Sequence, residues 1–162
     1  MTQSSDQLTE IVSPWRGYAL ICSVVLFLIA CVSPALVLHM KEQLGAAGSR
    51  WQGYQSISGA ALLGIGLALG WMRFNFTAFA NFPLWISWIL LARGRYSGSR
   101  FFSLLALAMS IETLQLIVQP YLTNEGGTTE GYLAFPHVGF YCWIGSMLVI
   151  AFASHRLKSE GQ

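Results

Sequence analysis

The chain has 162 residues, of which 54% are apolar, 14% aromatic and only 10% charged, and its formal net charge is +2. A soluble domain carries about a quarter charged residues, so this composition excludes an ordinary soluble globular domain. The small net charge, with basic residues in short clusters between apolar segments, also excludes a nucleic-acid-binding protein. The composition indicates a protein whose partner is the lipid bilayer.

Five apolar segments follow one another along the chain, at residues 17–38, 54–72, 76–92, 101–119 and 132–154. Each is close to the ~20 residues that a helix needs to cross ~30 Å of hydrocarbon, and none shows the alternation of a membrane barrel. We therefore predict an all-α fold, a small transmembrane helical bundle of five hydrophobic helices. The alternative is four spans plus one re-entrant or interfacial helix at residues 54–72.

Three parts of the chain are expected: a polar N-terminal tail at 1–16, a single helical membrane domain at 17–154 and a cytoplasmic C-terminal tail at 155–162. Lysine and arginine concentrate in cytoplasmic loops, which orients the spans. Five spans put most basic residues inside and leave Arg16 and Arg73 outside. The four-span alternative moves Arg16 inside and Lys41 and Arg50 outside. Both place the C-terminus in the cytoplasm.

The first segment contains "LIAC" at residues 28–31, the form of a lipoprotein cleavage site. The tail before it carries Asp6 and Glu10, whereas a signal peptide begins with basic residues. We interpret the segment as a retained helix that Pro34 bends or ends.

Small residues recur four apart in "SGAALLGIGLALGW". One stripe holds Ala60, Gly64 and Ala68, and the other holds Gly66 and Gly70. Such stripes allow helix backbones to approach closely. We predict helix packing within the bundle here, with a homodimer or partner-helix contact as the alternative.

One carboxylate, Glu112, lies inside an apolar segment, "SIETLQLIVQP". About 12 residues beyond Arg100, it is expected ~18 Å into the membrane, close to the midplane, with Gln115 and Gln119 on the same helix face. This polar stripe predicts either an interhelical hydrogen bond that holds register or, alternatively, a proton or ligand site. The candidate partners from other segments are Arg73, His137 and Asn81.

No metal, cofactor or catalytic site is predicted. Cys22, Cys31 and Cys142 form no CxxC pair, and the three histidines, at positions 39, 137 and 155, are not spaced as helical ligand pairs. No nucleophile and base can be paired from the sequence, which disfavours an enzyme.

The stretches "FANFPLWISWILLARGR", "NEGGTTEGY" and "GFYCWIGSMLVI" resemble those of small multi-span bacterial inner-membrane proteins of uncharacterised function. The resemblance covers residues 50 to 152 and rests on turn glycines, prolines and aromatics. It implies a multi-pass protein of the bacterial cytoplasmic membrane and supplies no catalytic residue.

Three functions are compatible with these features. The favoured one is a non-enzymatic protein that acts by helix–helix interaction, with a protein partner or as a homo-oligomer. It would be an accessory subunit of a membrane complex or an immunity-type protein against a membrane-active toxin. The second is a small proton- or cation-linked carrier or channel that uses Glu112. A membrane enzyme is the least favoured.

Overall fold

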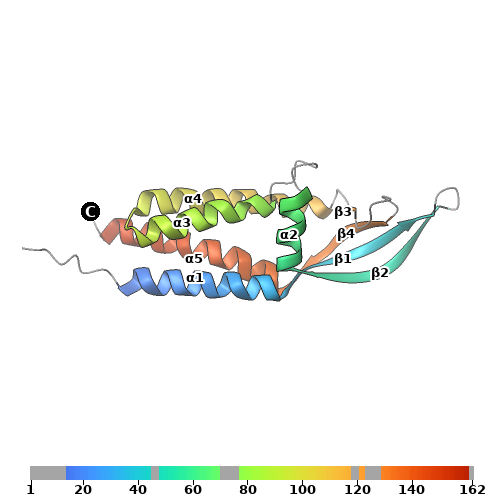
Figure 1. Ribbon diagram of the computed structural model, residues 1–162, viewed down its shortest axis with the longest axis horizontal. Coiled ribbons are helices and arrows are strands. Elements are labelled where there is room, and N and C mark those ends of the chain that lie inside the picture. The colour runs from blue at the N-terminus through green and yellow to red at the C-terminus, as the bar shows by residue number, and fades with distance from the viewer. Residues whose placement is uncertain (1–13, 45–47, 70–76, 118–120, 123–128, 161–162) are drawn as a thin grey trace, which may run out of the picture.

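A computed structural model describes residues 14–44, 48–69, 77–117, 121–122 and 129–160. It is elongated, with a bundle of long helices at one end and a sheet that projects from the other (Figure 1). Helix α2 (Gly59–Leu69) stands at the junction between the two parts.

The bundle contains four helical rods. α1 (Pro14–Val32) packs on α5 (Val138–Glu160), which also packs on α4 (Tyr96–Ser110), and α4 packs on α3 (Asn81–Ala92). Short 3-10 helices extend two of the rods, η3 (Thr77–Ala80) before α3 and η4 (Ile111–Ile117) after α4. Two helices, α1 and the stretch Val138–Ser159, are long and apolar enough to cross a membrane.

The sheet is antiparallel with the strand order β2-β1-β4-β3. β1 (Pro34–Gln43) is central, β2 (Ser49–Ser58) forms a hairpin with it, and β4 (Thr129–Pro136) pairs on its other side. β3 (Tyr121–Leu122) adds only two residues. The sequence favours this because α1 ends at Val32, just before Pro34, and an alternating apolar pattern then begins. Leu36, Leu38 and Met40 are buried from that pattern.

The predicted all-α fold with five hydrophobic helices is wrong. The first segment, 17–38, continues from helix into strand β1, and the second, 54–72, begins as strand β2 and contains a helix of only 11 residues. The four-span alternative also expected a helix throughout 54–72. The last segment, 132–154, likewise begins within strand β4. A run of apolar residues does not by itself distinguish a buried strand from a helix, and these segments joined the two. The single helical membrane domain expected at 17–154 likewise does not describe the fold.

The five-span arrangement of charges is also wrong. Arg156 lies over the ring of Trp15 at 5.0 Å, and Arg16 reaches the turn at Gly94. One end of the bundle, here called the arginine end, therefore collects Arg16, Arg93, Arg95, Arg100, Arg156 and Lys158. Lys41 and Arg50 lie on the sheet, at the opposite end of the molecule (Figure 1).

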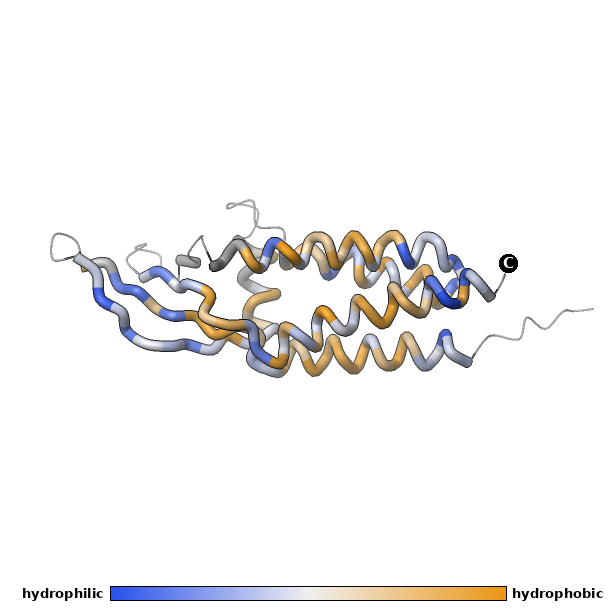
Figure 2. Tube along the Cα trace, turned by 180° about the vertical axis from the view of Figure 1, so that it is seen from behind, coloured by the Kyte–Doolittle hydropathy of each residue, from blue (hydrophilic) through white to orange (hydrophobic). Residues whose placement is uncertain are grey.

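The bundle is polar inside and apolar outside. Its buried polar residues all lie in helices: Ser23, Asn81, Ser87, Ser99, Ser103, Ser110, Thr113, Ser146 and Ser154. Large apolar side chains are exposed on the same helices, among them Ile21 and Leu28 of α1, Phe101 of α4 and Phe152 of α5. Figure 2 shows the hydrophobic residues along the bundle and the hydrophilic ones toward the C-terminal end and the sheet. Soluble domains have the reverse distribution.

Hydrogen bonds of the buried serines join the helices. Ser154 donates to the hydroxyl of Ser99 at 2.8 Å, and Ser99 donates to the carbonyl of Ser87 at 2.9 Å. These bonds connect α5, α4 and α3 in sequence. Small hydroxyl-bearing residues let helix backbones approach and bond within a medium that offers no water.

Two glycines allow the end of α1 to pack tightly at the junction. A Cβ at Gly139 would lie 2.9 Å from the Pro34 carbonyl oxygen and 3.1 Å from that of Ala30, and one at Gly59 would overlap the Ala30 carbonyl. These contacts are with backbone atoms, which cannot rotate away. The junction thus fixes the sheet relative to the bundle.

Candidate interaction surface on the sheet

A β-bulge determines which side chains gather on one face of the hairpin. Met40 pairs with Gly53 and Lys41 pairs with Trp51, so Gln52 is an extra residue in β2. Gly53 has a φ of +123°, a conformation that residues with a Cβ rarely adopt. In a regular strand, residues 51 and 54 would face opposite sides. The bulge places both Trp51 and Tyr54 against His39.

We call the resulting cluster the aromatic face: His39, Lys41, Trp51, Tyr54 and Tyr132. The ring of His39 is stacked between Trp51, at 4.1 Å, and Tyr54, at 4.7 Å. Tyr132 of β4 meets Trp51 edge-on at 5.8 Å, and the Lys41 ammonium lies 5.7 Å from the Trp51 ring. Stacked rings hold one another in place, so this surface is ordered in advance of binding.

The aromatic face is open despite its apolar character. Trp51 is 50% exposed and Tyr54 69% exposed. Tryptophan and tyrosine combine large contact area with few rotatable bonds, and they are enriched where proteins bind partners most strongly. An exposed, pre-ordered group of such rings is therefore a candidate interaction surface.

An acidic group borders the aromatic face. The Tyr132 hydroxyl donates a hydrogen bond of 3.0 Å to the Glu130 carboxylate. This hydrogen bond, together with partial desolvation and the negative charge of Glu130, raises the pKa of Tyr132 above its ordinary value. Tyr132 therefore stays a neutral donor at all physiological pH values.

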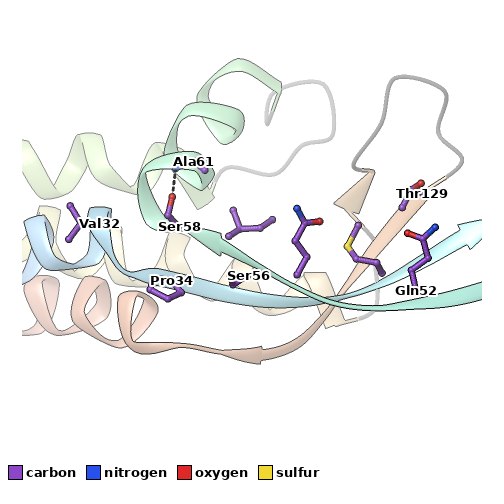
Figure 3. A pocket seen from close by; sticks show the side chains of 10 residues that line it. Val32, Pro34, Gln52, Ser56, Ser58, Ala61 and Thr129 are labelled. Atoms are coloured by element: carbon purple, nitrogen blue, oxygen red, sulfur yellow. Dashed lines mark hydrogen bonds between the residues drawn. The ribbon is translucent and has the colours of Figure 1, made fainter.

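The opposite face of the sheet carries a groove of about 780 Å³ (Figure 3). Side chains alternate along a strand, so Met40 and Gln52 face the groove while His39 and Trp51 face away from it. α2 borders the groove through Ala61, whose backbone N–H bonds to the Ser58 hydroxyl at 3.3 Å and so caps the helix.

The predicted polar stripe is only partly visible. Glu112 is half-buried in η4, which contacts strand β4, so it lies nearer the sheet end than the middle of the bundle. Gln115 belongs to the same 3-10 helix, but its side chain lies outside the description. Gln119 and Arg73 fall outside the described residues. The structure therefore neither joins nor separates Glu112 and Arg73.

The other two candidate partners have local roles. Asn81 is buried, donates to the Ala78 carbonyl at 2.8 Å and accepts from the indole of Trp143 at 2.9 Å. His137 lies between β4 and α5, and its backbone N–H bonds to the Ala35 carbonyl. Within the described part of the chain, the buried His137 Nδ1 has no hydrogen-bond partner, and neither does the Thr113 hydroxyl.

The small-residue stripes do not pack within the described chain at the positions that can be inspected. Ala60 and Gly64 are exposed, and a Cβ added at Gly64 would meet nothing within 4 Å. Gly66 and Ala68 lie in α2 without described surroundings, and Gly70 is outside the described residues. Close packing inside the bundle instead uses the buried serines and Gly139.

Metal ligands and thiols show no cluster. In the ranges that the structure describes, no group of three or more His, Cys, Asp or Glu residues is placed to hold a metal ion. The cysteines are free thiols, with Cys22 exposed and Cys31 and Cys142 half-buried.

Sequence reasoning missed every residue of the aromatic face. The stretch "SRWQGYQSIS" interleaves aromatic and polar residues around a glycine, which is the pattern of a half-exposed strand with a bulge. That signal was divided between a loop and the start of an expected helix.

Comparisons with known proteins supply no relative. No protein family, no curated protein and no solved structure matches this chain. Any function must therefore be argued from the molecule itself.

Proposed function

We propose that this chain is a multi-pass membrane protein of the bacterial cytoplasmic membrane. Its four helical rods are α1, α3 with η3, α4 with η4, and α5, and each crosses the bilayer. The observation that carries the proposal is the inverted distribution of the bundle, with serines buried and large apolar side chains exposed. A soluble monomer rarely exposes so extensive an apolar surface, whereas lipid covers it without cost.

The dimensions support this placement. α1 has 19 residues and α5 has 23, which correspond to ~28 and ~34 Å, close to the ~30 Å of a hydrocarbon core. Only 11% of the apolar window of α1 is buried, unlike the core helix of a soluble protein. α1 is also bonded into the bundle through Ser23, which favours a retained helix over a cleaved signal.

The charges orient the protein. The arginine end, with six lysine and arginine residues, belongs in the cytoplasm by the positive-inside rule. The sheet then projects on the outer side, where the aromatic face meets the aqueous phase. The C-terminus is cytoplasmic.

We further propose that the protein acts without catalysis, by presenting the aromatic face to a protein partner outside the bilayer. An accessory subunit of a membrane complex and an immunity-type protein both fit this role. Trp51 and Tyr54 supply exposed contact area, and Lys41 and Glu130 supply charges at its border. Helix contact through the exposed side of α2 remains a prediction.

Reporter insertions test the placement. A reporter inserted at Gly48, between β1 and β2, is expected to signal from the periplasm, and one fused after Glu160 from the cytoplasm. A cytoplasmic signal at Gly48, or release of the protein by alkaline carbonate, contradicts the membrane proposal.

Affinity purification in mild detergent tests the interaction. We expect wild-type protein to retain a stoichiometric partner and Trp51→Ala to retain about tenfold less or lower, since truncating a central aromatic typically costs ~2 kcal/mol or more. Phe135→Ala is the matched control, because Phe135 is 49% exposed on the same sheet but outside the aromatic face. Equal recovery with Trp51→Ala and wild type contradicts the proposed surface.

A further inference from the structure

The groove on the other face of the sheet has a graded lining. At the bundle end it begins at Val32 and Pro34, and at the far end it reaches Gln52 and Thr129 (Figure 3). Met40 and Ile57 provide apolar walls, and Gln55 adds a second amide. The groove thus passes from apolar to hydrogen-bonding surroundings along its length.

The apolar end is continuous with the surface that faces lipid in the proposed placement. Val32 is the last residue of α1 and is 81% exposed, and Leu28 and Ile29, one turn earlier, are also exposed. An acyl chain that leaves the bilayer along α1 therefore meets apolar atoms without a polar barrier. Its volume of about 780 Å³ lies within the range of sites that enclose small molecules.

The polar end is uncharged. None of the described residues that line the groove is a lysine, arginine, aspartate or glutamate. The carboxylate of Glu42 accepts a bond of 2.7 Å from the Gln52 amide, which fixes that amide on the groove wall. A phosphate enclosed by neutral amides would lose hydration without gaining a counter-charge, whereas hydroxyl and ester groups match amides directly.

We propose that the groove binds a lipid with an uncharged, hydroxyl-bearing headgroup that enters from the outer leaflet. One acyl chain lies along Val32, Ile57 and Met40, and the headgroup bonds to Gln55, Gln52 and Thr129. This inference rests on the proposed membrane placement, since it requires the groove to open at the outer surface of the bilayer.

Photolabelling in vesicles tests it. The full chain is reconstituted in phosphatidylethanolamine vesicles that contain a photoactivatable diacylglycerol, and the labelled peptides are mapped by mass spectrometry. We expect labelling to concentrate on residues 52–61 in the wild-type protein. Ala61→Trp fills the groove and should lower that labelling at least fivefold. Its control is Ala60→Trp, an exposed neighbour on α2 that does not line the groove, which should label as wild type.

A second variant guards against a folding defect. Gln55→Leu removes a headgroup donor at an exposed position and should lower labelling severalfold while the unfolding temperature stays that of wild type. Equal labelling in Ala61→Trp and Ala60→Trp overturns the proposal. Equal labelling of wild type by photoactivatable phosphatidylglycerol overturns the uncharged headgroup. If the reporters confirm the placement and labelling is absent from the groove, the groove assignment alone fails.

Discussion

Trp88 of α3 donates its indole N–H to the hydroxyl of Ser23 on α1 at 2.8 Å, although 65 positions separate them. The same hydroxyl donates to the Ser146 carbonyl of α5 at 2.8 Å. A single buried hydroxyl therefore joins three helices. Because Ser23 is 0% exposed, no solvent replaces these bonds when the hydroxyl is removed.

We predict that Ser23→Ala lowers the free energy of unfolding by about 1–2 kcal/mol, since it leaves the Trp88 donor without its acceptor. Thermal unfolding in detergent, followed by tryptophan fluorescence, measures the change. Cys22→Ala, at the exposed neighbouring position, should leave stability nearly unchanged. Equal effects of the two substitutions would show that the three-helix contact contributes nothing.

Gly139→Ala should destabilise the junction of bundle and sheet. The added methyl group would lie 2.9 Å from the Pro34 carbonyl oxygen and 3.0 Å from that of Ser33, and overpacking against backbone typically costs about 1–3 kcal/mol. Size-exclusion profiles and unfolding temperatures report the loss. Gly145→Ala is the control on the same helix, because its methyl group would make an ordinary contact of 3.6 Å with Leu26. Stability equal to that of Gly145→Ala refutes the close approach.

Gly53→Ala should disperse the aromatic face. The φ of +123° at Gly53 strains any residue with a Cβ by about 1–3 kcal/mol, and relief of that strain moves Trp51 and Tyr54 off His39. We expect a weaker near-ultraviolet circular dichroism signal and a loss of partner binding like that of Trp51→Ala. Gly64→Ala, in open space on α2, should leave both measurements unchanged.

The sequence predicted some of the bundle correctly in position but not the architecture. Apolar segments 76–92 and 101–119 correspond to α3 and α4 with their 3-10 extensions, because these rods are apolar along most of their length. The helix start at Pro14, four residues before Tyr18, and the break before Pro34 follow from local rules for proline.

The sheet was not predicted because its signals were absorbed by neighbouring helices. "PALVLHM" extends the apolar run of α1, so its alternation was counted as more helix. The pairing of β1 with β4, about 90 residues apart in the chain, is a tertiary contact that no local pattern encodes. The aromatic face depends on that pairing for Tyr132 and on a bulge for Trp51 and Tyr54, so it could not be assembled from spacing alone.

Titration of Tyr132 tests the border of the aromatic face. Its folded pKa is raised above the ordinary value of 10.0 by the hydrogen bond to Glu130, so the neutral phenol is favoured in the folded state. The stabilisation is present below pH 10 and is lost as the pH rises through the folded pKa. The ultraviolet absorbance of tyrosinate, compared with that of Tyr132→Phe, should show this group titrating late. In Glu130→Gln it should titrate at lower pH, and an unchanged titration would contradict the interaction.

Glu112→Gln separates the interaction role from the carrier role. The substitution keeps the shape and hydrogen-bonding capacity of Glu112 but abolishes its charge and titration. Because Glu112 is half-buried near the sheet end of the bundle, we expect a change of less than about 1 kcal/mol in stability and unchanged partner recovery. Proton flux into liposomes, measured with an internal pH dye, should be the same for wild type, Glu112→Gln and protein-free vesicles. A flux present in wild type and lost in Glu112→Gln would instead establish the carrier, since only that role requires the carboxylate to exchange a proton.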